Sequence, residues 1–81
     1  MNGTPTDHRQ FVAEVTGRSG GLWQLVCHLD IRGPDGMLLD STKLMESPPL
    51  IQSEGHARAT ARELARSYEF SPDDIKWDVR P

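Results

Sequence analysis

The only cysteine of the chain, Cys27, is followed directly by His28, one of three histidines, and Asp30 stands two residues further on. A thiolate beside an imidazole can ligate a metal ion or form a nucleophile–base pair, and a histidine beside a carboxylate can act as a general base. Whether these side chains can meet depends on the element that carries them. Apolar side chains occupy every second position of this stretch, which predicts a strand with one buried face: Trp23, Leu25, Cys27, Leu29 and Ile31.

In such a strand Cys27 and His28 point to opposite faces, so they cannot bind one metal ion or react together. We expect Cys27 to be a buried thiol, and the isolated His8 and His56 do not supply the further ligands that a metal site needs. We therefore expect no metal, no cofactor and no catalytic residue. His28 and Asp30 share the wetter face, where we interpret them as an ordinary solvated pair. A small enzyme that uses this pair is the weakest of the functional hypotheses.

Three arginines at four-residue spacing form a stripe on a predicted helix: Arg58, Arg62 and Arg66. Such a stripe can contact the phosphates of a nucleic acid at successive turns, or an acidic protein partner. The ordinary interpretation is a solvated helix face. Glu54 lies four residues before Arg58, and Glu63 and Glu69 each lie three residues from Arg66, so local ion pairs account for much of the stripe.

Leu50 and Ile51 follow two prolines in the least regular loop of the chain. They can present an extended apolar strip to a partner protein. We favour the alternative that they cover the open edge of the core beside the helix. Trp23 and Trp77 lie on the apolar faces of their predicted strands, so we expect both in the core, and an exposed tryptophan would become a candidate partner contact.

The elements that position these residues begin with strands. Period-two alternation is clear in three segments, and a fourth is less regular, with a bulge or bend near Leu44. The segments "GRSGG" (17–21) and "GPDG" (33–36) have the glycines and the proline that are typical of tight turns. The predicted strands are 10–16, 23–32, 37–45 and 75–79.

A helix is predicted at 54–69, with Ser53 as its N-cap and Glu54 at the positive end of its dipole. Its core-facing stripe is expected to contain Ala57, Ala61, Leu64 and Tyr68, with Thr60 and Ala65 at its margins. The element order β-β-β-α-β indicates an α+β fold, in which a three-stranded antiparallel meander carries one helix on a face, followed by a short C-terminal strand. That last strand runs in the direction of the first and third strands, so it can pair beside either one.

The composition limits the size and the setting of the protein. Eighty-one residues, with 36% hydrophobic and 26% charged, favour one small domain at 10–81 that follows a flexible N-terminus at 1–9. The lone cysteine, the N-terminus without a signal pattern and the short apolar runs predict a cytoplasmic protein that does not enter a membrane. The net charge of −3 includes no basic block, so nothing attracts nucleic acid in general.

The leading functional hypothesis is a small non-enzymatic protein-interaction or regulatory module. Its partner is expected to be a protein, and a second copy of the chain is one alternative, because a thin core and open sheet edges favour association. Nucleic-acid binding, of an RNA-binding type, through the arginine stripe is the second hypothesis. The candidate partner-binding residues are Arg58, Arg62, Arg66, His28, Asp30, Leu50 and Ile51.

Overall fold

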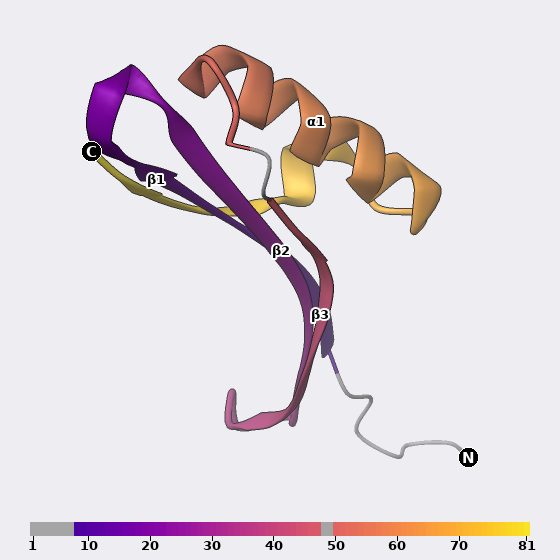
Figure 1. The fold of residues 1–81 in the computed structure, drawn as a ribbon. Helices are drawn as coiled ribbons and strands as arrows, with labels where there is room; N and C mark the ends of the chain where they lie inside the picture. The colour runs from indigo at the N-terminus through magenta and orange to yellow at the C-terminus, as the bar shows by residue number, and fades with distance from the viewer. Residues whose placement is uncertain (1–7, 48–49) are drawn as a thin grey trace.

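A four-stranded mixed sheet carries one helix on a single face in the computed structural model, which describes residues 8–47 and 50–81 (Figure 1). The predicted α+β class and the order β-β-β-α-β are confirmed. The elements are β1 (His8–Gly17), β2 (Trp23–Arg32), β3 (Leu38–Glu46), α1 (Glu54–Ser67) and β4 (Lys76–Arg80).

The strand order in the sheet is β3-β2-β1-β4. The first three strands form the predicted antiparallel meander, and β4 lies parallel to β1, with Ala13 opposite Trp77 and Val15 opposite Val79. This arrangement answers the question that the sequence left open. Beside β1, the apolar side of β4 continues the face that α1 covers, whereas the outer side of β3 is left open.

The core lies between α1 and the facing side of β1 and β2. Phe11, Leu25 and Cys27 are fully buried there, and Trp23 and Trp77 are half-buried against them. Alanines on α1 bring the helix close to the sheet: Ala57, Ala61 and Ala65 are all fully buried.

The predicted core stripe of the helix is partly wrong. Tyr68 is 37% exposed, because α1 ends at Ser67 and Tyr68 is the C-cap residue, whereas Ala65 takes the buried position. Glu69 follows with a positive φ of 66°, which turns the chain out of the helix. The predicted N-cap is confirmed, since the Ser53 hydroxyl accepts a hydrogen bond from the His56 backbone N–H at 3.0 Å.

The strand bounds differ little from the predictions. β2 has the predicted bounds, and β1 begins at His8, so His8 and Arg9 belong to the strand; the rest of the expected flexible N-terminus, 1–7, lies outside the described residues. The predicted bulge in β3 is confirmed: Cys27 pairs with Met45 and His28 with Lys43, which leaves Leu44 as the extra residue.

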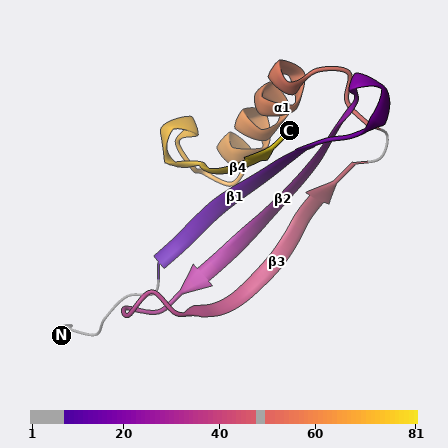
Figure 2. The ribbon, with the colours of Figure 1, turned by 90° about the vertical axis from the view of Figure 1, so that its left-hand side faces the viewer.

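One end of the sheet extends beyond the helix (Figure 2). The β2–β3 turn lies at this end, and three consecutive apolar side chains there are strongly exposed. Met37 is 61% exposed, Leu38 47% and Leu39 54%. The expected strand pattern at Met37 and Leu39 therefore does not place these residues in the core.

Candidate functional site

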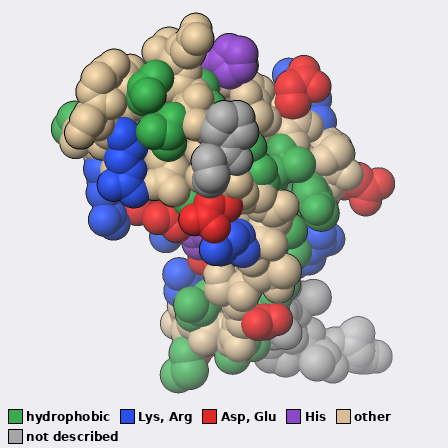
Figure 3. All heavy atoms as spheres, viewed as in Figure 1, with side chains coloured by type: hydrophobic (Ala, Val, Ile, Leu, Met, Phe, Trp, Pro, Cys, Tyr) green, Lys and Arg blue, Asp and Glu red, His purple; other side chains and the backbone are tan. Residues whose placement is uncertain are grey.

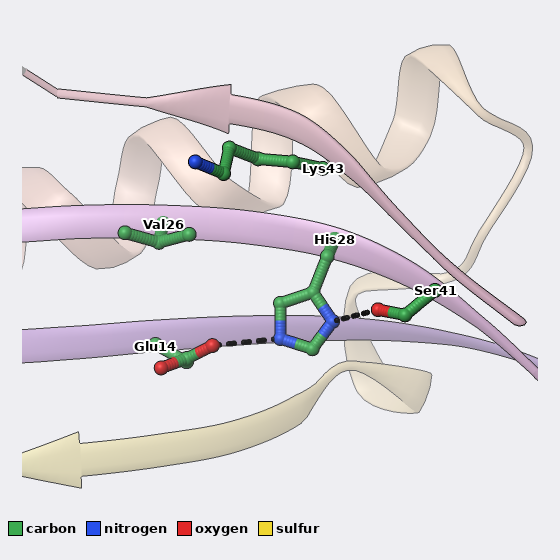
Figure 4. Close-up of a pocket in the computed structure, with 5 residues that line it drawn as sticks. All are labelled: Glu14, Val26, His28, Ser41 and Lys43. Carbon is green, nitrogen blue, oxygen red and sulfur yellow. Dashed lines mark hydrogen bonds and ion pairs between the residues drawn. The ribbon is translucent and has the colours of Figure 1, made fainter. Parts of the chain in front are cut away.

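The face of the sheet opposite α1, which we call the open face, carries a hydrogen-bonded cluster around His28 (Figure 4). The strand register brings in Glu14 from β1 and Ser41 from β3, beside His28 and Asp30 of β2. The His28 Nε2 lies 2.8 Å from the Glu14 Oε2, and the His28 Nδ1 lies 2.9 Å from the Asp30 Oδ1. The predicted sharing of one face by His28 and Asp30 is confirmed, and Glu14 and Ser41 are members that the sequence did not reveal.

His28 therefore faces a carboxylate oxygen at each ring nitrogen. A neutral imidazole has one N–H, so both contacts are hydrogen bonds only when the ring carries two protons. The His28 side chain is 19% exposed and that of Asp30 6%. The cluster is thus a partly buried polar network, in which the His28 ring links Glu14 of β1 to Asp30 of β2.

The interpretation of His28 and Asp30 as an ordinary solvated pair is wrong, because Asp30 is buried within the open face although α1 does not cover that face. Burial by itself raises the pKa of Asp30. The hydrogen bonds from Ser41 and His28, together with the positive charges of His28 and Arg32, outweigh burial, so the pKa of Asp30 lies below its ordinary value of 3.8. Asp30 is therefore ionised at neutral pH and anchors the network as its anion.

The convergence of Glu14, His28 and Ser41 invites comparison with a catalytic triad. The Ser41 hydroxyl donates to the Asp30 Oδ1 at 2.7 Å and lies 3.3 Å from the His28 Nδ1, a nitrogen that itself faces Asp30. A nucleophilic serine needs a base that accepts its proton, whereas this proton is directed at a carboxylate that is a weak base. The arrangement holds three strands together and does not activate the serine.

Cys27 lies in the core on the opposite side of β2, so the predicted separation of Cys27 and His28 is confirmed. Burial raises the pKa of the Cys27 thiol to about 11, which keeps it protonated and unreactive. His8 and His56 are exposed, at the start of β1 and in the first turn of α1. Within residues 8–47 and 50–81, no group of three or more His, Cys, Asp or Glu side chains is placed to hold a metal ion.

The arginine stripe lies along α1 and is mostly ion-paired. Arg58 lies 2.8 Å from Glu54, and Arg66 lies 3.3 Å from Glu63, as the spacing predicted. Arg62 has no ion pair within the part of the chain that the structure describes. Arg58 and Arg62 both lie over the ring of Trp77.

The other edge of the sheet combines an unpaired strand with apolar side chains. Among the described residues, β3 is bordered by a strand on one side only, that of β2. A hollow of about 300 Å³ between β3 and α1 is lined by Met45, Thr60, Glu63, Leu64 and Ser67. We call this edge, with the exposed Met37, Leu38 and Leu39, the β3 surface. No sequence motif predicts the β3 surface. The only signal is that apolar residues do not alternate regularly along β3, so the apolar residues at both ends of the strand cannot all face the core.

The loop after β3 returns to the core. The Ile51 N–H and C=O exchange hydrogen bonds with Trp23, both at 2.7 Å, and the Ile51 side chain packs against the core, whereas Leu50 is 39% exposed. The expectation that Leu50 and Ile51 cover the open edge of the core is therefore confirmed for Ile51 only. The two preceding prolines lie outside the described residues.

Comparison of the chain with protein-family models, with curated proteins and with solved structures finds no match. None of the helices in the described part of the chain has the length and apolar character needed to cross a membrane. Any function must therefore be argued from the residues themselves. On the face drawn in Figure 3, acidic and basic side chains are interspersed, without one large region of either charge.

Proposed function

We propose that this chain is a small non-enzymatic protein-interaction module that binds an extended segment of a partner protein along the β3 surface. The observation that carries the proposal is the exposure of Met37, Leu38 and Leu39 at the start of an edge strand, whose outer side pairs with no other described strand. Exposed apolar side chains that gather in this way mark interaction sites. An open strand edge offers backbone donors and acceptors to an added strand.

The apolar side chains suit the two ends of such a segment. At one end of β3 lie Leu38 and Leu39, and at the other lies Met45, beside the hollow that Leu64 of α1 also lines. A partner strand with apolar residues near both ends would cover these side chains. Each such residue that becomes fully buried contributes roughly 1.5–3 kcal/mol.

The middle of β3 makes the pairing selective. The Ser41 backbone N–H donates to the Asp40 side chain at 2.9 Å, so Asp40 occupies a donor on the outer edge of the strand. Natural edge strands use such charged side chains and bulges to prevent indiscriminate pairing. Lys43 is already paired with Glu46 at 2.7 Å, so a partner with a basic residue near Asp40 suits the charge pattern of this strand.

A second copy of the chain fits this surface less well than a different segment. In a two-fold antiparallel pair of β3 strands, residues that lie directly opposite each other share a face of the sheet. Asp40 pairs with Ile31 on the helix side, and Lys43 pairs with His28 on the open face, so Asp40 and Lys43 cannot oppose each other in such a dimer. Homodimerisation stays a prediction, and light scattering that gives a monomer mass at every concentration would contradict it.

Nucleic-acid binding through the stripe on α1 has less support, because two of its three guanidinium groups are ion-paired. Catalysis has less support because the Ser41 proton is held by Asp30. A cytoplasmic location also belongs to the proposal, since a single buried cysteine suits a reducing compartment.

Selection of peptides from a random display library on the full chain tests the proposal. Peptides that bind at the β3 surface are expected to shift the backbone amide resonances of Ser41 and Lys43. The double substitution L38S/L39S should lower their affinity at least about tenfold, the equivalent of about 1.4 kcal/mol or more. The control L50S, which replaces another exposed leucine outside β3, should leave affinity unchanged. Selected peptides that shift other residues, or that bind L38S/L39S as tightly as the native chain, would refute the proposal.

A further inference from the structure

Two guanidinium groups share one aromatic ring at the β4 edge of the sheet, on the side away from the β3 surface. The Arg58 Cζ lies 5.0 Å and the Arg62 Cζ 5.5 Å from the centroid of the Trp77 ring. Trp77 is held in place because it pairs with Ala13 of β1 and packs against the core. A cation over an indole ring is attracted by the ring's electrons, so the ring orders both arginine side chains.

The charges of this pair are not balanced. Glu54 compensates Arg58 at 2.8 Å, whereas Arg62 has no acidic partner within the described residues and lies one helical turn from two other arginines, Arg58 and Arg66. Like charges at this spacing repel each other. An anion placed at Arg62 would relieve that repulsion.

We propose that Arg62, held over Trp77, binds a carboxylate of an acidic protein segment. A guanidinium group is planar and offers paired N–H donors that match the two oxygens of a carboxylate. The Arg62 side chain lies over the ring and is exposed, so its donors can be reached from solvent. Trp77 thus orders the side chain before binding and lowers the entropy that is lost when a carboxylate is bound.

The surroundings favour a short acidic side chain over a nucleic acid. The chain has a net charge of −3, and the other two arginines of the stripe, Arg58 and Arg66, are already paired with Glu54 and Glu63. A nucleic-acid backbone carries closely spaced phosphates that would meet these acids. One or two carboxylates of a peptide need only the position at Arg62.

The test is a titration of the full chain, at low ionic strength, with a capped hexapeptide that contains two glutamates among four serines, which we call the glutamate peptide. The readout is the indole N–H resonance of Trp77, identified by its loss in W77F. The glutamate peptide should shift this resonance, and the same peptide with glutamine in place of both glutamates should not. R62Q should weaken binding about tenfold or more, the loss that follows removal of a charge-assisted hydrogen bond. R66Q, which removes an exposed and ion-paired arginine one turn away, should weaken it no more than about twofold.

Three outcomes would overturn the proposal. They are native affinity in R62Q, equal losses in R62Q and R66Q, and a uridine hexanucleotide that shifts the Trp77 resonance at lower concentration than the glutamate peptide. R62K keeps the charge without the planar group and should weaken binding about threefold, so it carries the test if R62Q does not fold. Because Arg62 lies on the β4 side of α1, failure here leaves the proposal for the β3 surface unaffected.

Discussion

Replacement of Asp30 by asparagine tests whether the cluster on the open face stabilises the fold. The asparagine side chain would keep one oxygen for the Ser41 hydroxyl but lose the charge that faces His28 at 2.9 Å. Hydrogen bonds to charged groups contribute roughly 1.5–3 kcal/mol each, and the Asp30 side chain is too buried for water to replace the lost bond. D30N should therefore lower the free energy of unfolding by about 2 kcal/mol, which corresponds to a fall in Tm of roughly 8–16 °C for a domain of this size.

The loss should depend on pH in one direction. The pKa of Asp30 is lower in the folded state than in the unfolded state, so the unfolded state binds more protons near pH 3.8. The stability that Asp30 contributes is therefore present above that pH and is lost as the pH falls through the folded pKa. Urea unfolding of both proteins, followed by circular dichroism from about pH 6 down to about pH 3, should show the difference narrowing as the pH falls.

The control is D74N, which replaces an exposed acid and should change stability by no more than about 0.5 kcal/mol. A D30N effect that stays constant over this pH range would show that shape, and not charge, makes the contribution. A D30N protein as stable as the native chain would refute the role assigned to the cluster.

Three further predictions concern the core and the β3 edge. Because burial raises the pKa of Cys27 to about 11 from 9.0, iodoacetamide should modify the folded protein roughly a hundredfold more slowly than the unfolded chain, and equal rates would contradict the burial. A61L overfills the contact between α1 and the sheet and should lower the free energy of unfolding, measured in urea, by about 1–3 kcal/mol. A59L, on the exposed face of the helix, should lower it by less than about 0.5 kcal/mol, and equal losses would contradict the close approach of the helix. D40A frees the Ser41 backbone N–H at the strand edge, so light scattering should show a mass that rises with concentration, and a constant mass would count against the guarding role of Asp40.

Local patterns were sufficient to predict most elements. The alternation of apolar residues in β2 and the capping of α1 by Ser53 each depend only on residues close together in the sequence. Both predictions are confirmed. The position of β4 was not accessible in this way. A right-handed crossover from β3 through α1 places β4 on one fixed side of β3, as seen from the helix. Side-chain periodicity does not reveal on which side of β3 the strands β2 and β1 lie, so it cannot decide whether β4 pairs with β1 or with β3.

The candidate sites show the same limit. His28 and Asp30 lie two residues apart on one strand, so their shared face follows from alternation. Glu14 and Ser41 lie 14 and 13 residues from His28, and only the strand registers bring them to it. The position of Arg62 over the Trp77 ring also requires the helix to lie over β1 and β2 with β4 beside β1. No spacing in the sequence predicts that tertiary arrangement.

The cluster on the open face and the β3 surface are physically connected. α1 packs on β1 and β2, so β3 lies at the margin of the core and is held to the sheet by its pairing with β2 and by the bond from Ser41 to the buried Asp30. An edge strand that must receive a partner has to keep its shape without a neighbour on the outer side, since any ordering left to the moment of binding reduces affinity. The network that joins Glu14, His28, Asp30 and Ser41 orders β3 from the face that the helix leaves uncovered. We therefore propose that the network supports the strand edge that forms the binding surface. Its polar side chains hydrogen-bond to one another and not to a substrate.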